Sequence, residues 1–248
     1  MRQLLISLFA LALTLCIAGC AGGGLSEDPF PSPADYEVHG IDVSKYQGDI
    51  DWDSVRASGV QFAWIKATEG GDRVDEKFAQ NWASAKAAGI PRGAYHFAYW
   101  CRPAEEQAAW FTRNVPNDPD ALPPVLDVEW NGQSKTCPKK LPREEAIAQM
   151  KVILAAMEQA YGKRPVIYTA IDFHRDVMQG EFNDYAIWVR SVKCNPALKY
   201  GDRKWRFWQH TAEGRVAGIK GNVDRNAFNG SAKDWQVWLA GVKVASST

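Results

Sequence analysis

The sequence predicts an α/β barrel with eight strands, fewer than eight helices and an irregular last part. Three observations lead to this prediction. Helical segments separate the early predicted strands, which is the order of parallel βαβ units. Between His210 and Asn222 there are too few residues for a helical crossover, so some late strands should pair antiparallel. Acidic residues also stand at the carboxyl ends of predicted strands, where such barrels place their catalytic groups.

The amino-terminal part combines short apolar runs with one helical pattern. Three runs are predicted strands: 39–43, 61–66 and 92–97. Residues 75–88 are a predicted helix, because Phe78, Trp82 and Ala85 recur on one stripe and Gly89 follows its end.

Two further helices flank the next strand. Residues 103–115 begin with a proline and then two acids, residue types that favour the start of a helix. Residues 143–161 show apolar side chains at helical spacing, and Gly162 ends the pattern. Four later apolar runs complete the strands: 165–169, 185–189, 205–210 and 222–227.

The run 123–130 is the predicted centre of the site. It is apolar except for Asp127 and Glu129 and therefore predicts a buried strand. Side chains two residues apart share a face of a strand, so the two Cα atoms should lie about 6.6 Å apart. Like charges in a low dielectric resist joint ionisation, which raises one pKa and suits a proton donor in glycoside hydrolysis. The alternative is a pair at a strand end that meets Lys and Arg partners.

Composition excludes one class of partner. Lys and Arg together number 29, and so do Asp and Glu, which gives a net charge of zero over 248 residues. A protein that binds nucleic acid through bulk positive charge is therefore not expected. Eleven Trp residues are many for this length, and aromatic faces are a weak indication of a sugar site.

The amino terminus predicts export. Residues 1–19 have a basic start, an apolar segment too short to span a membrane, and a small-residue region before Cys20, which resembles the lipobox of bacterial lipoproteins. Cys20 would then be acylated, and Ala21 after it favours the outer membrane; a plain signal peptide is the alternative. Residues 20–37 are predicted to be a flexible tether, and 38–248 the folded domain.

Three cysteines remain for the folded domain. In an oxidising compartment the expected arrangement is one disulfide and one free thiol. Cys101 and Cys137 follow predicted strands in consecutive loops at the same end of the sheet, so we expect them to pair and Cys194 to stay free. Zinc is disfavoured because neither Cys-x-x-Cys nor His-x-x-x-His spacing occurs, and no metal site is expected.

Seven segments, in order from about residue 38 to residue 240, resemble the family 25 glycoside hydrolases, the Chalaropsis-type lysozymes. They are 39–48, 65–70, 93–97, 126–129, 167–169, 207–211 and 223–226. The resemblance implies a modified TIM-like β/α barrel that cleaves the β-1,4 bond between N-acetylmuramic acid and N-acetylglucosamine of peptidoglycan. His210 and Arg225 depart from the family pattern, and we expect these departures to affect sugar contacts.

The resemblance also implies the roles of four acids. Glu129 would be the general acid, Asp127 its neighbour, and Asp42 and Asp224 would complete an acidic floor. Ionised aspartates near Glu129 would hold its proton and would stabilise a cationic transition state. Either an aspartate or the N-acetyl group of the substrate could be the nucleophile. No cofactor is expected; the expected partners are glycan strands and, through Cys20, a membrane, with the protein a monomer.

Several other residues carry two interpretations. Lys66 is near the sugar or ion-paired to a floor aspartate, Tyr95 and Tyr168 bind sugar or pack in the barrel, and Trp208 lines the cleft or belongs to the core. His174 is expected on the surface. Two other functions remain open at this point: a catalytically inactive glycan-binding lipoprotein on the same barrel, and a divalent-metal site for phosphoester or deacetylase chemistry.

Overall fold

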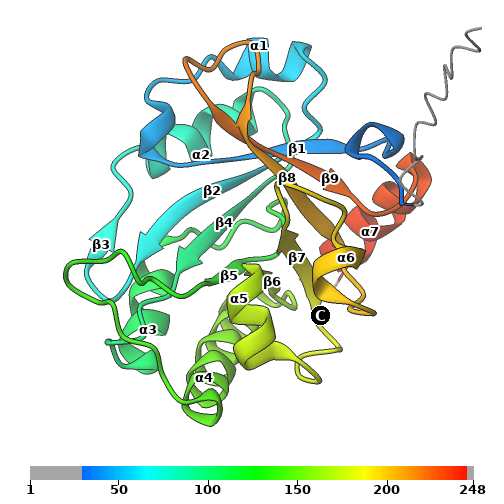
Figure 1. Cartoon of the computed structure of the whole chain (residues 1–248). Helices are drawn as coiled ribbons and strands as arrows, with labels where there is room; N and C mark the ends of the chain where they lie inside the picture. The colour runs from blue at the N-terminus through cyan, green and yellow to red at the C-terminus, as the bar shows by residue number, and fades with distance from the viewer. Residues whose placement is uncertain (1–29, 245–248) are drawn as a thin grey trace, which may run out of the picture.

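The computed structural model describes residues 30–244, in which nine strands form one sheet that closes into a barrel (Figure 1). The order is β1-β9-β8-β7-β6-β5-β4-β2-β3, and pairing of β1 with β2 closes the barrel of eight strands. The bounds are β1 (His39–Val43), β2 (Phe62–Glu69), β3 (Arg73–Val74), β4 (Arg92–Phe97), β5 (Val125–Val128), β6 (Val166–Thr169), β7 (Ala186–Arg190), β8 (Phe207–Gly214) and β9 (Val223–Phe228). The predicted fold class is confirmed.

The direction of β9 decides where its acid lies. All neighbouring barrel strands from β1 round to β8 are parallel, whereas β9 is antiparallel to both β8 and β1. The short connection from β8 to β9 allows only a hairpin, which confirms the predicted irregular end. The amino end of β9 therefore lies beside the carboxyl ends of the parallel strands. Asp224, its second residue, is thus at that end.

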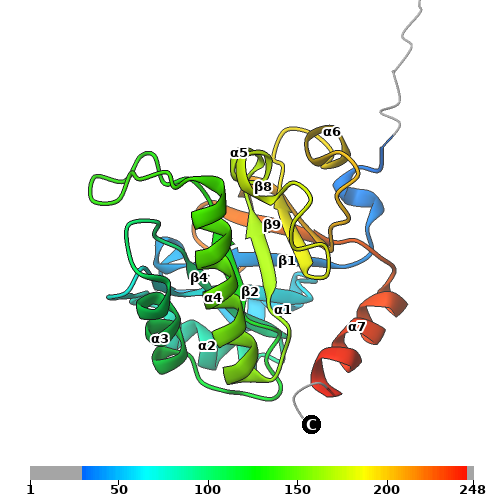
Figure 2. The same cartoon turned by 90° about the horizontal axis from the view of Figure 1, so that it is seen from below.

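Seven α-helices occur among residues 30–244. The three predicted ones are confirmed, and they lie together on one side of the barrel (Figure 2). The bounds are α1 (Trp52–Ala57), α2 (Phe78–Ala87), α3 (Ala104–Asn114), α4 (Arg143–Tyr161), α5 (Ile171–Phe173), α6 (Ala197–Tyr200) and α7 (Ala232–Val244). A π-helical turn, η3 (His174–Met178), continues α5, and short 3-10 turns are η1 (Pro33–Asp35) and η2 (Lys45–Gln47). Sequence patterns missed most of these because so few turns carry no measurable periodicity.

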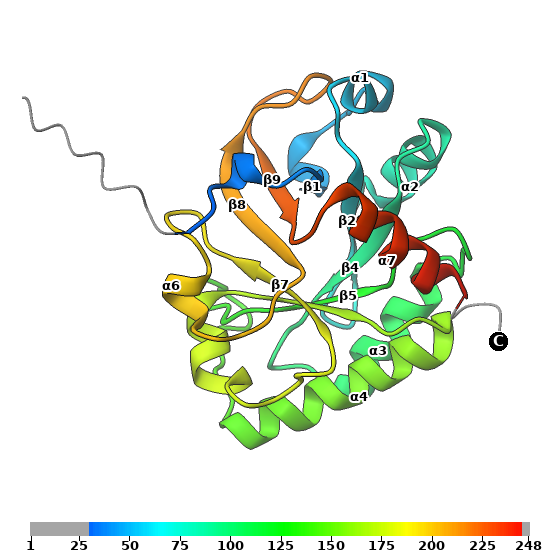
Figure 3. The same ribbon diagram turned by 90° about the vertical axis from the view of Figure 1, so that its right-hand side faces the viewer.

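Large aromatic side chains fill the barrel interior. Phe62, Trp64, Trp188 and Phe207 are all buried there, and Trp235 packs against Phe62 with ring centroids 5.3 Å apart. Trp235 belongs to α7, the helix labelled beside the barrel in Figure 3. Small residues make room for these rings: a Cβ atom at position 93 would lie 2.1 Å from the Trp64 ring, and one at position 40 would lie 2.4 Å from the Phe62 ring. These aromatic rings thus fill the inside of the barrel below the carboxyl ends of the parallel strands.

The cysteine prediction is confirmed. Cys101 and Cys137 form a disulfide with an S–S distance of 2.07 Å, and Cys194 is free. The bond joins the loop after β4 to the loop after β5. Next to it, Trp100 Nε1 donates to the backbone oxygen of Glu129 at 2.7 Å, so the disulfide stiffens the loops that hold this acid.

The predicted signal peptide and the lipidation site Cys20 lie outside the described residues. The described end of the predicted tether contacts the domain: Asn195 donates to the backbone oxygen of Pro31, and the Tyr36 ring packs against Trp205. Within residues 30–244, no helix has the length and apolar character needed to cross a bilayer.

Candidate active site

A cavity of about 280 Å³ opens at the carboxyl ends of the parallel strands. We call it the catalytic cavity. It brings together all four predicted acids, Lys66 and both predicted tyrosines. Its lining residues are Asp42, Ser44, Tyr46, Lys66, Tyr95, Phe97, Asp127, Glu129, Tyr168, Trp188, Arg190, Gln209 and Asp224. None of the four acids forms an ion pair within the described part of the chain, so the alternative of a strand-end pair with Lys or Arg partners is not supported.

Asp42 is held by two amide side chains. Gln209 Nε2 donates to Asp42 Oδ2 at 3.0 Å and to Oδ1 at 3.2 Å, and Asn226 Nδ2 donates to Oδ2 at 2.8 Å. The amide oxygens are occupied as well, by Tyr168 Oη–H on Gln209 at 2.9 Å and by Trp188 Nε1–H on Asn226 at 2.8 Å. With their oxygens engaged, the amides can present only N–H groups to Asp42. The carboxyl group is therefore fixed in position.

Asp42 and Asp224 act as a pair. They face each other across the β1–β9 ladder, and their side chains are hydrogen-bonded, which requires one of them to be protonated. Burial, and then the charge of Asp224, raises the pKa of Asp42 well above its usual value. Burial also raises the pKa of Asp224, against the opposing effects of Arg190 and of the bond from Asp42. The pKa of both carboxyls is raised, and their hydrogen bond makes them share a proton.

Asp127 and Glu129 form a second pair of carboxyls. Asp127 is only 7% exposed, and its Oδ1 atom is buried without a hydrogen-bond partner among the described residues. Burial, and then the charge of Glu129, raises the pKa of Asp127 well above its usual value. Burial raises the pKa of Glu129 too, although Arg190 opposes this. The strand ends at Val128, so Glu129 is one residue beyond it, at the cavity mouth.

Lys66 pairs with a partner that the sequence did not indicate. Its Nζ atom lies 2.6 Å from Glu69 Oε2, not against a floor aspartate, and 5.1 Å from the centre of the Phe97 ring. Burial acts to raise the pKa of Glu69, but the bonds from Lys66 and Tyr99 outweigh it, so this pKa is lowered. The Lys66 charge also opposes the rise in the pKa of Asp127. Lys66 thus joins Glu69 to the edge of the catalytic cavity, beside the four acids.

The chain also matches a known protein family. The family model "Glycosyl hydrolases family 25" matches residues 41–219, which include every acid but Asp224. The chain belongs to glycosyl hydrolase family 25. The family makes the protein a glycoside hydrolase, and the resemblance predicted from the seven segments is confirmed.

Relatives in family 25 are similar over most of the chain. "Lysozyme M1" of Streptomyces globisporus is 40% identical over 217 residues, 81% of this chain and 71% of its own length. The structure of a family 25 glycosyl hydrolase from Bacillus anthracis is 38% identical, has a TM-score of 0.75, and covers 82% of this chain and 93% of its own. The bacterial lysozyme from Streptomyces coelicolor is 37% identical with a TM-score of 0.74, covering 84% and 98%.

Trp208 does not lie in the cavity of this family 25 domain. Its neighbours Phe207 and Gln209 point into the barrel, so Trp208 points outward, 3% exposed, and its Nε1 donates to Ser191 O at 2.9 Å. Substrate contact by Trp208 was therefore a wrong expectation, and its core interpretation holds. His210 and Arg225 do not line the cavity either, so the expectation that they affect sugar contacts is not supported.

Sequence reasoning missed several lining residues. Tyr46 is 81% exposed on η2, Trp188 and Arg190 are two residues apart on β7, and Gln209 follows Phe207 by two on β8. Side chains alternate between the two faces of a strand. Counting every second residue from one known to face the barrel interior would have found Trp188, Arg190 and Gln209. Tyr46 lies on the 3-10 turn η2 after β1, outside any strand, so alternation gives no signal there.

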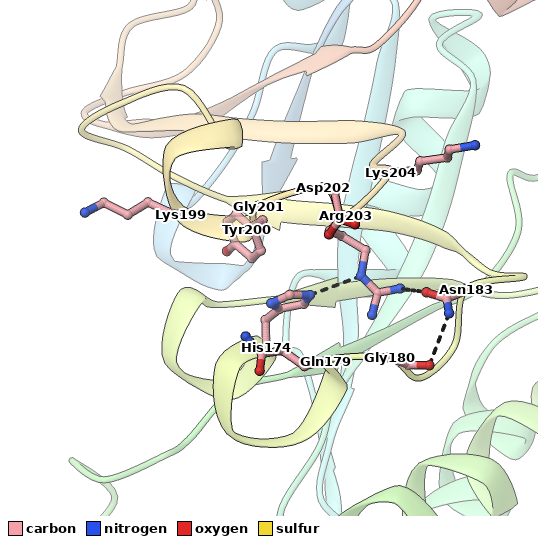
Figure 4. A pocket seen from close by; sticks show the side chains of 10 residues that line it. All are labelled: His174, Gln179, Gly180, Asn183, Lys199, Tyr200, Gly201, Asp202, Arg203 and Lys204. Carbon is pink, nitrogen blue, oxygen red and sulfur yellow. Dashed lines mark hydrogen bonds between the residues drawn. The ribbon is translucent and has the colours of Figure 1, made fainter.

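A larger cavity, about 570 Å³, lies outside the barrel between η3 and α6 (Figure 4). We call it the Arg203 cavity. Arg203 donates there to His174 Nε2 at 3.0 Å, to Asn183 Oδ1 at 2.8 Å and to the backbone oxygens of Met178 and Glu181. His174 is 4% exposed, so its predicted surface position was wrong. The Lys199 and Lys204 side chains point away from the cavity in Figure 4. Asp202 is the one acid among the described residues that line the Arg203 cavity, so this cavity has no second carboxyl for acid catalysis of the kind described above.

The four acids are not arranged as a metal site. Among residues 30–244, no group of three His, Cys, Asp or Glu side chains is arranged to hold a metal ion. The chemistry of the cavity is that of protonated and ionised carboxyls close together.

Proposed function

We propose that the protein hydrolyses the β-1,4 bond between N-acetylmuramic acid and N-acetylglucosamine in peptidoglycan, with Glu129 as the general acid. The observation that supports this most strongly is the gathering of four carboxyls without ion-pair partners in one cavity at the carboxyl end of the barrel. The relatives named lysozyme and muramidase add support for the substrate. An envelope or extracellular location follows from a substrate of this kind.

Each acid has a role in the proposal. Burial raises the pKa of Glu129, which favours its protonated form, and in the proposal it donates this proton to the glycosidic oxygen as the bond breaks. The sugar that remains develops positive charge at its anomeric carbon. The charge of Asp224, and of Asp127 once it ionises, stabilises that transition state more than the bound substrate. Asp42 positions Asp224 through their shared proton.

The direct test is Glu129→Gln, which keeps the shape but cannot donate the proton. Hydrolysis of purified peptidoglycan should fall by about 10²- to 10⁴-fold. Glu144→Gln is the matched control, because Glu144 is 81% exposed on α4 and does not line the catalytic cavity. Mass spectrometry of the products should find N-acetylmuramic acid at the reducing end. Equal activity in wild type and Glu129→Gln would reject Glu129 as the acid, and a different reducing-end sugar would reject the bond.

We further propose lipid attachment at Cys20 and a position on the periplasmic side of the outer membrane. The support is sequence alone: a basic start, an apolar segment and a cysteine after Ala18-Gly19. Incorporation of labelled palmitate should be lost in Cys20→Ala and kept in Cys16→Ala, whose cysteine lies within the apolar segment. Label retained in Cys20→Ala would reject acylation at that site.

A further inference from the structure

A third cavity, of about 310 Å³, adjoins the catalytic cavity. Tyr46 and Lys66 line both, so these two side chains form the boundary between them. The loop that carries η2 forms one wall of this lateral cavity, and the turn between β2 and β3 forms the other. A group attached to a sugar in the catalytic cavity can therefore reach the lateral cavity by passing only Tyr46 and Lys66.

Hydrogen bonds hold the walls of the lateral cavity in place. Asp75 is 8% exposed, and its carboxylate accepts from the backbone N–H groups of Lys45 at 3.0 Å and Lys77 at 2.9 Å, which ties the η2 loop to the start of α2. On the other wall, Trp110 Nε1 donates to the backbone oxygen of Arg73 at 2.9 Å. The cavity is thus a formed feature of the fold.

The rim of the lateral cavity offers charges of both signs. Arg73 has a side chain 57% exposed and makes one long ion pair, 3.4 Å to Glu69, so most of its five N–H donors remain available. Glu76 is 75% exposed, and its bond to Lys45 lowers its pKa, so it is ionised near neutral pH. Asp72, 61% exposed and 3.2 Å from Arg102 through one carboxylate oxygen, adds a second carboxylate. Neutral sugar hydroxyls do not need such charges, but a ligand that carries both carboxylates and an amine does.

We propose that the lateral cavity binds the short peptide that peptidoglycan carries on the lactyl group of muramic acid. This inference rests on the proposed function, because it takes the muramic acid to be bound in the catalytic cavity. Free carboxylates of the peptide face Arg73, and the amine of its diamino acid faces Glu76 and Asp72. The protein is then selective for glycan strands that still bear peptides.

The test compares two forms of one substrate: soluble glycan strands with their peptides, and the same strands after an amidase has removed them. The quantity measured is the ratio of kcat/KM on the two forms. This ratio should fall about 5- to 10-fold in Arg73→Gln and in Glu76→Gln. It should not change in Arg56→Gln, an exposed arginine on α1 outside both cavities. The loss should appear in KM for the peptide-bearing strands.

A binding measurement keeps the proposal testable if a variant folds poorly. Calorimetry with the free stem peptide and the Glu129→Gln protein should show binding that is lost when Arg73→Gln is added, while thermal unfolding checks the fold. If wild type cleaves neither form of the strands, the proposed function fails. If it cleaves both with a ratio that Arg73→Gln and Glu76→Gln leave unchanged, the lateral cavity proposal alone is overturned.

Discussion

The catalytic cavity and the Arg203 cavity differ in how their buried polar groups are bonded. In the larger Arg203 cavity, the guanidinium donates to His174, Asn183 and two backbone oxygens. In the smaller catalytic cavity, four carboxyls have no ion-pair partner, and Asp127 Oδ1 has no hydrogen-bond partner among the described residues. Volume therefore does not identify the active site of this protein. The gathering of buried carboxyls without ion-pair partners does.

The difference follows from the opposing demands of stability and catalysis. A buried charge without partners destabilises the folded state, whereas a buried cation with a full set of acceptors holds segments together. A raised pKa at Glu129 is useful only where a proton must be given away. We accordingly interpret the hydrogen bonds of Arg203 as stabilising the contact between η3 and the segment after α6. The carboxyls of the catalytic cavity serve the reaction and not stability.

Among the changes that test the contrast between the two cavities, Asp127→Asn should have the largest effect, and this effect is on activity. The substitution keeps the shape but removes the charge that stabilises the cationic transition state, so kcat should fall about 10²- to 10³-fold. Because the buried Asp127 carboxyl has an unbonded oxygen, thermal stability should stay equal or rise. Reducing-sugar release and thermal unfolding measure the two effects. If Asp127→Asn clearly lowered stability and kept full activity, Asp127 would have a structural role and not a catalytic one.

Arg203→Leu should have the opposite pattern. It leaves the backbone oxygens of Met178 and Glu181 and the ring of His174 without their donor, so the free energy of unfolding should fall by about 2–4 kcal/mol. Activity per folded molecule should stay within about twofold. Urea unfolding followed by kinetics at low temperature gives both quantities. Arg215→Leu, an arginine in the β8–β9 connection, is the control.

The two cavities should respond to pH in opposite directions. Burial, and then the charge of Arg203, lowers the pKa of His174 from 6.5 to about 4, so its contribution to stability is present above pH 6.5 and is lost as pH falls toward 4. The pKa of Asp127 is raised from 3.8, so its contribution is present below that value and is lost as pH rises through the raised pKa.

Chemical unfolding from pH 4 to 8 tests this contrast. Relative to wild type, His174→Gln should lessen the loss of stability on the acid side. Asp127→Asn should lessen the loss on the neutral side. If both variants changed the same limb of the pH profile, the assignment of opposite protonation behaviour would be wrong.

The smallest expected effect is a shift in the pH profile of kcat. Activity requires protonated Glu129, so kcat should decline as pH rises through the raised pKa of this group. Arg190 opposes that rise, and Arg190→Gln should therefore move the alkaline decline up by about one pH unit or less. Lys193→Gln, in the loop after β7, is the control. A shift toward lower pH would show that Arg190 does not act on Glu129 through its charge.

Strong local patterns made most of the fold predictable. The α4 helix has the predicted bounds because five turns of apolar spacing specify one face. The strand β4 also matches its predicted bounds. The short α1, α5 and α6 were missed because they hold at most two turns, and α7 was missed although it is long enough to have been seen.

Sequence by itself determined the family, the eight barrel strands, the disulfide and which acids are brought to one end, because strand periodicity and local spacing encode direction and face. Only the tertiary structure decided the partners: that Lys66 meets Glu69, that Gln209 and Asn226 hold Asp42, that Trp208 faces outward and that His174 is buried against Arg203. These contacts join residues brought together by barrel closure or by a choice between the two faces of a strand. A linear pattern does not specify that geometry.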